Sequence, residues 1–282
     1  MKKLMILLMA AMIIPFAGCG LAQPYTNYPG AQEFAAGGAV NQEVKAIPVD
    51  GTSLRIEEES EVAVEIAISG SPIADSCAAF TDAQRAVYER LLGNLDGNPD
   101  LKQALTSLSG IEAADVHIKP VLFFGRGEQH AAAGLALTGA KDVQYTNNGN
   151  SYTIAYTSAE GAAVSLTGTW DAAADSLVCT GSRDGRENFY AEYRRTPYGY
   201  VGQYYLAHDN GASSLFVVTL KGGEGTFGIS SVSGKPVALT GSEPSDYPAC
   251  CDEWYAINGS TITGKMSDGT AINIECGNTE GD

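Results

Sequence analysis

Residues 200–221 read YVGQYYLAHDNGASSLFVVTLK, which is two apolar runs joined by the polar turn Asp209-Asn210-Gly211. Both runs are rich in aromatic and β-branched side chains, which favour strands, and Asn-Gly favours the positive φ angles of a tight hairpin turn. Between Leu215 and Leu220, apolar side chains occupy both alternating faces. A strand of this kind needs a cover on each side. The stretch therefore predicts a hairpin near the centre of a sheet.

The same pattern continues on both sides of this hairpin. From about Val143, short apolar or alternating runs are separated by turn signals such as Asn148-Gly149 and Asp268-Gly269, which is typical of an antiparallel meander. The expected strands are 151–157, 163–170, 176–180, 188–194, 200–208, 214–221, 226–232 and 237–240. Tyr145 to Gly149 and Tyr255 to Gly259 also begin similar segments, which indicates one hairpin unit used twice or two independent hairpins.

Two helices are expected before the meander. Thr81 and Gln84 form a capping-box pattern, which predicts a helix over about 82–92 that stops at Gly93. Asn98 is the expected cap of a second helix, over about 99–109.

Other segments have weaker patterns. Residues 116–124 are expected to form a buried strand, and 128–137 fit a small helix or a strand. Residues 61–69 alternate in hydropathy and are expected to form a strand, with 53–58 as its hairpin partner.

These elements predict an α+β fold, in which two adjacent helices pack on one face of a large twisted or curved antiparallel sheet, either open or closed into a barrel. With 44% hydrophobic residues, the chain can bury a substantial core. We expect one domain over 41–282, with a subdivision near 140 as the alternative.

The amino-terminal segment indicates export. Lys2 and Lys3 precede an apolar run that ends at Ala17-Gly18-Cys19-Gly20, a pattern typical of a secretory signal. Phe16 to Cys19 resembles the lipobox of bacterial lipoproteins, although Phe16 stands where that family usually has Leu. The resemblance implies a signal peptide over 1–18, a diacylglycerol on Cys19, and a membrane anchor in the bacterial cell envelope. An ordinary cleaved signal or an uncut anchor is the alternative.

Residues 19–40 are rich in Gly, Ala, Pro, Gln and Asn and are expected to form a tether. Without Lys2 and Lys3, 15 basic residues remain against 33 acidic ones, which gives a formal charge of −18. This charge opposes binding to nucleic acid.

The sequence gives no clear catalytic or cofactor motif. Residues 223–228 match the letters of a dinucleotide fingerprint, but a strand is expected after them where a helix is required. Residues 96–100 resemble the start of a calcium loop, but Leu101 stands where Gly is required. His117, His130 and His208 lie far apart in the sequence. We therefore assign no catalytic residue, metal or cofactor.

Four arginines, Arg183, Arg186, Arg194 and Arg195, fall within thirteen residues. Together with nearby tyrosines they are a candidate contact for an anion or a glycan. Cross-strand ion pairs and ordinary packing are the alternative.

Five cysteines remain after Cys19. In an exported protein we expect one or two disulfides among Cys179, Cys250, Cys251 and Cys276, with Cys77 as the unpaired thiol. A thiolate metal site at 250, 251 and 276 is the alternative, but it lacks the usual C-x-x-C spacing.

Three functions follow as hypotheses. The first is an anchored lipoprotein with a non-catalytic role, either binding an unknown ligand or envelope partner or serving as an envelope structural component. The second is a carrier of lipid or lipoproteins, because a curved sheet with covering helices resembles bacterial lipoprotein-sorting factors. The third is an envelope hydrolase or metalloenzyme without a recognisable motif.

Overall fold

The computed structural model describes residues 70–95, 98 and 101–276 of the chain. The expected signal peptide, the tether, the lipidation site Cys19 and the expected hairpin over 53–69 all lie outside these residues. Within the described part, no helix is both long and apolar enough to cross a membrane.

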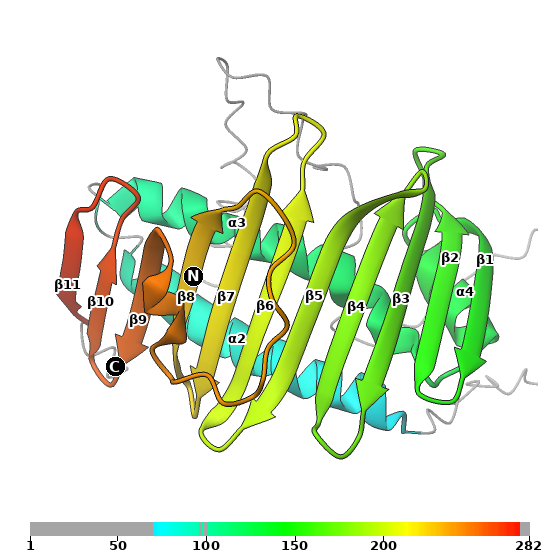
Figure 1. The fold of residues 1–282 in the computed structure, drawn as a ribbon, viewed down its shortest axis with the longest axis horizontal. Helices are drawn as coiled ribbons and strands as arrows, with labels where there is room; N and C mark the ends of the chain where they lie inside the picture. Colours follow the sequence, from blue (N-terminus) through cyan, green and yellow to red (C-terminus); the bar gives the residue numbers. More distant parts are fainter. Residues whose placement is uncertain (1–69, 96–97, 99–100, 277–282) are drawn as a thin grey trace, which may run out of the picture.

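The described residues form one sheet of 11 antiparallel strands in sequence order, which is open and not closed into a barrel (Figure 1). The strands are β1 (Lys141–Asn148), β2 (Ser151–Thr157), β3 (Ala163–Asp171), β4 (Ser176–Arg183), β5 (Arg186–Thr196), β6 (Gly199–Ala207), β7 (Ser213–Lys221), β8 (Glu224–Ser231), β9 (Glu253–Asn258), β10 (Thr261–Lys265) and β11 (Ala271–Glu275). The predicted α+β class with a large antiparallel sheet is therefore confirmed.

The helices lie on one face of this sheet, which we call the inner face (Figure 1). They are α2 (Pro72–Leu95), α3 (Lys102–Ile118) and α4 (Glu128–Ala136), and a 3-10 turn, η2 (Lys119–Phe123), follows α3. The shorter α4 packs against the edge strand β1.

Aromatic side chains fill the space between the helices and the inner face. Phe80 of α2 stacks on Tyr193 of β5, with ring centroids 4.6 Å apart and planes inclined by 11°. Tyr200 contacts the Phe80 ring edge-on at 5.7 Å, and Tyr204 lies beside it at 6.4 Å. Phe80, Tyr193 and Tyr204 are at most 1% exposed. Aromatic side chains therefore fill the space between α2 and the inner face at this point.

The first helix is longer than the sequence predicted. It begins at Pro72 and passes through Thr81, whose hydroxyl donates to the carbonyls of Cys77 and Ala78 one turn earlier. The capping-box prediction was therefore wrong. Gly93 lies inside the same helix and does not end it.

The second helix also differs from its expected bounds. It starts at Lys102 and continues through Gly110 to Ile118. The strand predicted over 116–124 was wrong, because these residues form the end of α3 and then η2, where Pro120 occupies the first turn. The segment 128–137, for which the sequence allowed a helix or a strand, forms the helix α4 over 128–136.

The strand predictions over 151–231 agree with β2 to β8 to within a few residues. The predicted strand at 237–240 was wrong, because these residues have no regular secondary structure. They belong to residues 232–252, which cross the sheet face opposite the helices, here called the outer face (Figure 1). We call this segment the strap.

The two similar sequence segments form matching units at opposite ends of the sheet. Asn148 pairs with Ser151 across the β1–β2 turn, and Asn258 pairs with Thr261 across the β9–β10 turn. The next turns also match, since Gly161 and Gly269 have φ angles of 87° and 88°.

Candidate functional site

The strap is fixed to the outer face by hydrogen bonds from sheet side chains. Gln203 of β6 donates to the carbonyl of Val237 at 2.9 Å, and Thr219 of β7 donates to that of Ser245 at 2.6 Å. Tyr198, in the β5–β6 turn, donates to the carbonyl of Glu243 at 3.0 Å. The strap therefore has a defined path over the middle strands.

The end of the strap sits closely on the sheet beside Trp254. It contains the 3-10 turn η3 (Tyr247–Cys250), which ends next to Cys251. A Cβ atom at Gly228 would lie 2.5 Å from the Pro248 carbonyl oxygen and 2.7 Å from Cys251 Sγ. A side chain at this position would therefore displace η3 from the sheet.

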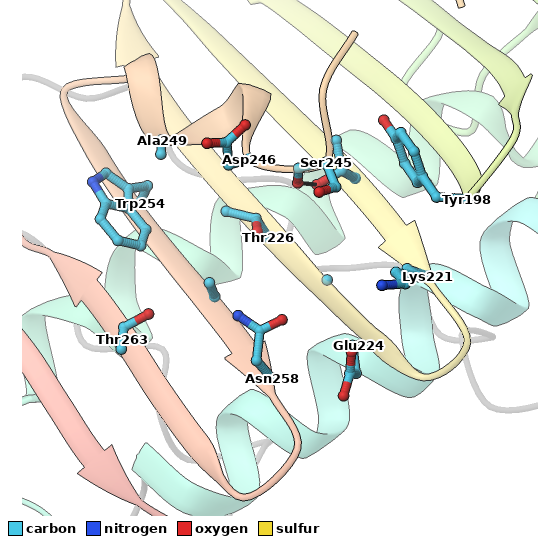
Figure 2. Close-up of a pocket in the computed structure, with 13 residues that line it drawn as sticks. Tyr198, Lys221, Glu224, Thr226, Ser245, Asp246, Ala249, Trp254, Asn258 and Thr263 are labelled. Atoms are coloured by element: carbon cyan, nitrogen blue, oxygen red, sulfur yellow. Dashed lines mark hydrogen bonds between the residues drawn. The ribbon is translucent and has the colours of Figure 1, made fainter. Parts of the chain in front are cut away.

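A pocket of about 300 Å³ lies on the outer face where the strap meets β7 to β10 (Figure 2). Its lining is mostly polar, with two aromatic side chains. The lining residues are Tyr198, Thr219, Lys221, Glu224, Gly225, Thr226, Ser245, Asp246, Ala249, Trp254, Ala256, Asn258 and Thr263. This pocket is the candidate functional site.

The floor of the pocket is one cross-strand row. Thr219 pairs with Thr226, Thr226 with Ala256, and Ala256 with Thr263. Because alternate residues of a strand share a face, Trp254 and Asn258 stand on either side of Ala256, each about 6.6 Å away along β9. The small Ala256 thus leaves a hollow between two large side chains.

Charged groups stand around the rim. Lys221 and Glu224 flank the β7–β8 turn as a cross-strand pair, and Asp246 comes from the strap. Glu224 accepts a hydrogen bond from the backbone N–H of Gly259 at 2.8 Å. Within the described part of the chain, Lys221 and Asp246 make no ion pair. Their charged groups are therefore available to a ligand.

The four arginines do not gather at one place. Arg183 and Arg186 face each other at one end of β5, whereas Arg194 and Arg195 lie about 27 Å away at the other end. Arg194 pairs with Glu192 at 2.9 Å, and Arg195 lies over the Tyr200 ring at 4.6 Å. Arg194 therefore makes its ion pair within β5 and not across strands as the alternative expected, whereas Arg195 makes a ring contact with the neighbouring strand.

The five cysteines of the described part are free thiols. Cys179 is buried on the inner face, while Cys250 and Cys251 lie at the end of η3 on the outer face. The backbone N–H of Cys276 donates to the Ser260 carbonyl at one end of β10. At the other end of β10, the side chain of Lys265 donates to the backbone carbonyl of Cys251. Five strand residues separate these ends by about 13 Å, beyond disulfide reach. Apart from the neighbours Cys250 and Cys251, the expected partners are therefore not brought together.

The histidines also stand apart. His117 is on α3 and stacks on Phe189 at 5.1 Å, and burial lowers its pKa. His130 is on α4, and His208 bonds to Ser214 at 2.9 Å. Among the described residues, no group of three or more His, Cys, Asp or Glu side chains is arranged to hold a metal ion.

Apart from Tyr198, one of the tyrosines near the arginines, sequence reasoning missed the pocket residues. The alternation in Glu253–Asn258 was a usable signal, because it puts Trp254, Ala256 and Asn258 on one face. The contribution of the strap had no such local signal. Comparisons with family models, curated proteins and solved structures found no match for this chain.

Proposed function

We propose that this protein is a lipid-anchored lipoprotein of the bacterial cell envelope, with a non-catalytic binding role. Cys19 is the attachment site, and residues 19–40 tether the domain to the membrane. The proposed anchor rests on the lipobox-like segment that ends at Cys19. The proposed ligand site is the outer-face pocket.

One observation supports a binding role: polar and aromatic side chains converge on the pocket beside Trp254. A carrier would need an apolar cavity. The best candidate for one, the space under the helices, is filled by Phe80 and its aromatic neighbours. A hydrolase of the Ser–His or Cys–His type would need a nucleophile beside a histidine base, and the three described histidines lie on different elements.

The anchor is tested by metabolic labelling with an alkyne fatty acid. We expect label and membrane association in the unaltered chain, and loss of both in Cys19→Ala. Cys250→Ala is the matched control, because Cys250 is an exposed thiol far from the leader in sequence. Equal labelling of the two variants would exclude lipidation at Cys19.

The binding role is tested with polysaccharide, peptide and lipid fractions of a bacterial cell envelope. The chain has two tryptophans, Trp170 and Trp254, so Trp170→Phe leaves Trp254 as the only tryptophan reporter. We expect one fraction to change its emission saturably. If no fraction does so, the pocket has no binding role.

A further inference from the structure

We infer that the outer-face pocket binds an uncharged carbohydrate, as a mono- or disaccharide unit of a glycan. This inference rests on the proposed binding function and names the class of its ligand.

The aromatic side chains fit this ligand. Trp254 and Tyr198 are both partly exposed and lie at different ends of the pocket (Figure 2). Pyranose rings present an apolar face of C–H groups, which packs well on an aromatic ring, while the ring edge carries hydroxyls. An amphipathic aromatic wall therefore suits a sugar better than it suits a fully polar ion.

The remaining lining offers both hydrogen-bond donors and acceptors. Asn258 carries an amide, Lys221 an ammonium and Asp246 a carboxylate, and Thr226 and Thr263 add hydroxyls from the floor. No hydrogen bond joins the side chains of Lys221, Asp246 and Asn258 to another described group. A sugar hydroxyl both donates and accepts, so it can pair with every one of these types.

Charge argues against an anionic ligand. The charged lining residues are one cation, Lys221, and two carboxylates, Glu224 and Asp246. A phosphate or sulfate needs several donors and an excess of positive charge, which this rim does not supply. The pocket volume of about 300 Å³ also matches a small polar unit.

The sheet argues against an extended peptide. Strands β7 to β10 are interior strands, each paired on both sides. Their backbone N–H and C=O groups are already used, so a peptide cannot add as a further strand here. Recognition must come from side chains, and these are hydroxyl, amide, charged and aromatic.

The test uses the Trp170→Phe protein, in which Trp254 reports on its own pocket. We would titrate it with maltose, cellobiose, N,N′-diacetylchitobiose and N-acetyllactosamine, each to about 20 mM, a range that covers weak millimolar binding. We expect a saturable change in Trp254 emission with at least one sugar. Adding Asn258→Ala should weaken that affinity by about tenfold or more.

Thr180→Ala is the control, because Thr180 lies on the outer face of β4, outside the pocket, and its loss should leave the affinity unchanged. Equal sugar affinity with and without Asn258 would overturn the inference. If none of the sugars binds, but inorganic phosphate or an envelope peptide fraction gives an Asn258-dependent response, the carbohydrate inference fails while the binding function stands. If no probe changes Trp254 emission, both fail.

Discussion

The carboxylate of Glu192 accepts a hydrogen bond from the backbone N–H of Leu239 at 2.9 Å, although 47 residues separate the two. Tyr190, Arg194 and Gln203 donate to the same carboxylate at 2.7, 2.9 and 3.1 Å. The Glu192 side chain is 0% exposed. A charge buried this fully is tolerated because donors surround it. Glu192 therefore joins the strap to the sheet.

Replacing this carboxylate should release the strap. Glu192→Ala leaves four donors without their acceptor, and we expect a loss of about 3–5 kcal/mol in the free energy of unfolding. Hydrogen exchange at the Leu239 amide should accelerate. Glu187→Ala is the matched control, because it removes only an exposed ion pair to the strap residue Lys235 at 3.3 Å, worth less than about 1 kcal/mol. Equal exchange at Leu239 in both variants would mean that Glu192 does not hold the strap.

Two helical glycines should respond in opposite ways to the same substitution. A Cβ atom at Gly110 of α3 would lie 2.7 Å from the Phe216 ring, whereas one at Gly93 of α2 would meet nothing within 4 Å. We expect Gly110→Ala to cost about 1–3 kcal/mol through overpacking. Gly93→Ala should be neutral or stabilising by up to about 1 kcal/mol.

Urea denaturation measures both effects. Adding Phe216→Leu to Gly110→Ala should recover part of the loss, since the smaller side chain removes the ring that the new methyl meets. Equal stability of the two single variants would show that α3 does not approach Phe216 this closely.

Strands β2 to β8 were predictable because alternation is a local signal. Residues 151–157 matched β2 at both ends. The start of α2 was not predictable in this way. Ser71 donates to the carbonyl of Phe124 at 2.6 Å and accepts from the N–H of Ala74 at 3.4 Å, so a contact 53 residues away helps to fix the helix start.

The pocket was not predictable for the same reason. Its floor joins Thr226 of β8 to Ala256 of β9, and the strap lies between these residues in the chain. No local pattern sets that pairing or the path of the strap. Trp254 could be assigned to a strand face, but not to a site.

Thiol labelling should separate the cysteines by burial. Cys77 and Cys179 are 1% and 0% exposed, and burial raises the pKa of Cys77 to about 12 and that of Cys179 well above its usual value. Because the thiolate is the reactive form, both should resist N-ethylmaleimide in the folded protein. Cys250 is exposed and should react first.

Peptide mapping by mass spectrometry would locate the label. In urea, Cys77 and Cys179 should label as fast as Cys250. Rapid labelling of either one under native conditions would contradict the burial of these two thiols.

Asp115 should make the stability depend on pH. Its carboxylate accepts from Gln84 at 2.9 Å, beneath Tyr204, whose hydroxyl donates to Gln84 Oε1. Burial raises the Asp115 pKa to about 6, although the hydrogen bonds from Gln84 and the charges of Lys119 and Arg85 oppose the shift. The folded state therefore holds this proton more tightly than the unfolded chain, whose Asp pKa is about 3.9.

The contribution of the protonated Asp115 carboxyl to the free energy of unfolding is fully present below about pH 4 and is lost as the pH rises through about 6. A shift of this size corresponds to on the order of 3 kcal/mol. The asparagine in Asp115→Asn does not titrate. The free energy of unfolding of this variant minus that of the unaltered chain should therefore rise by up to that amount between pH 4 and pH 7. Urea denaturation of both proteins at several pH values measures the difference, in which the other titrating groups cancel. A difference that stays constant with pH would show that folding does not raise the Asp115 pKa.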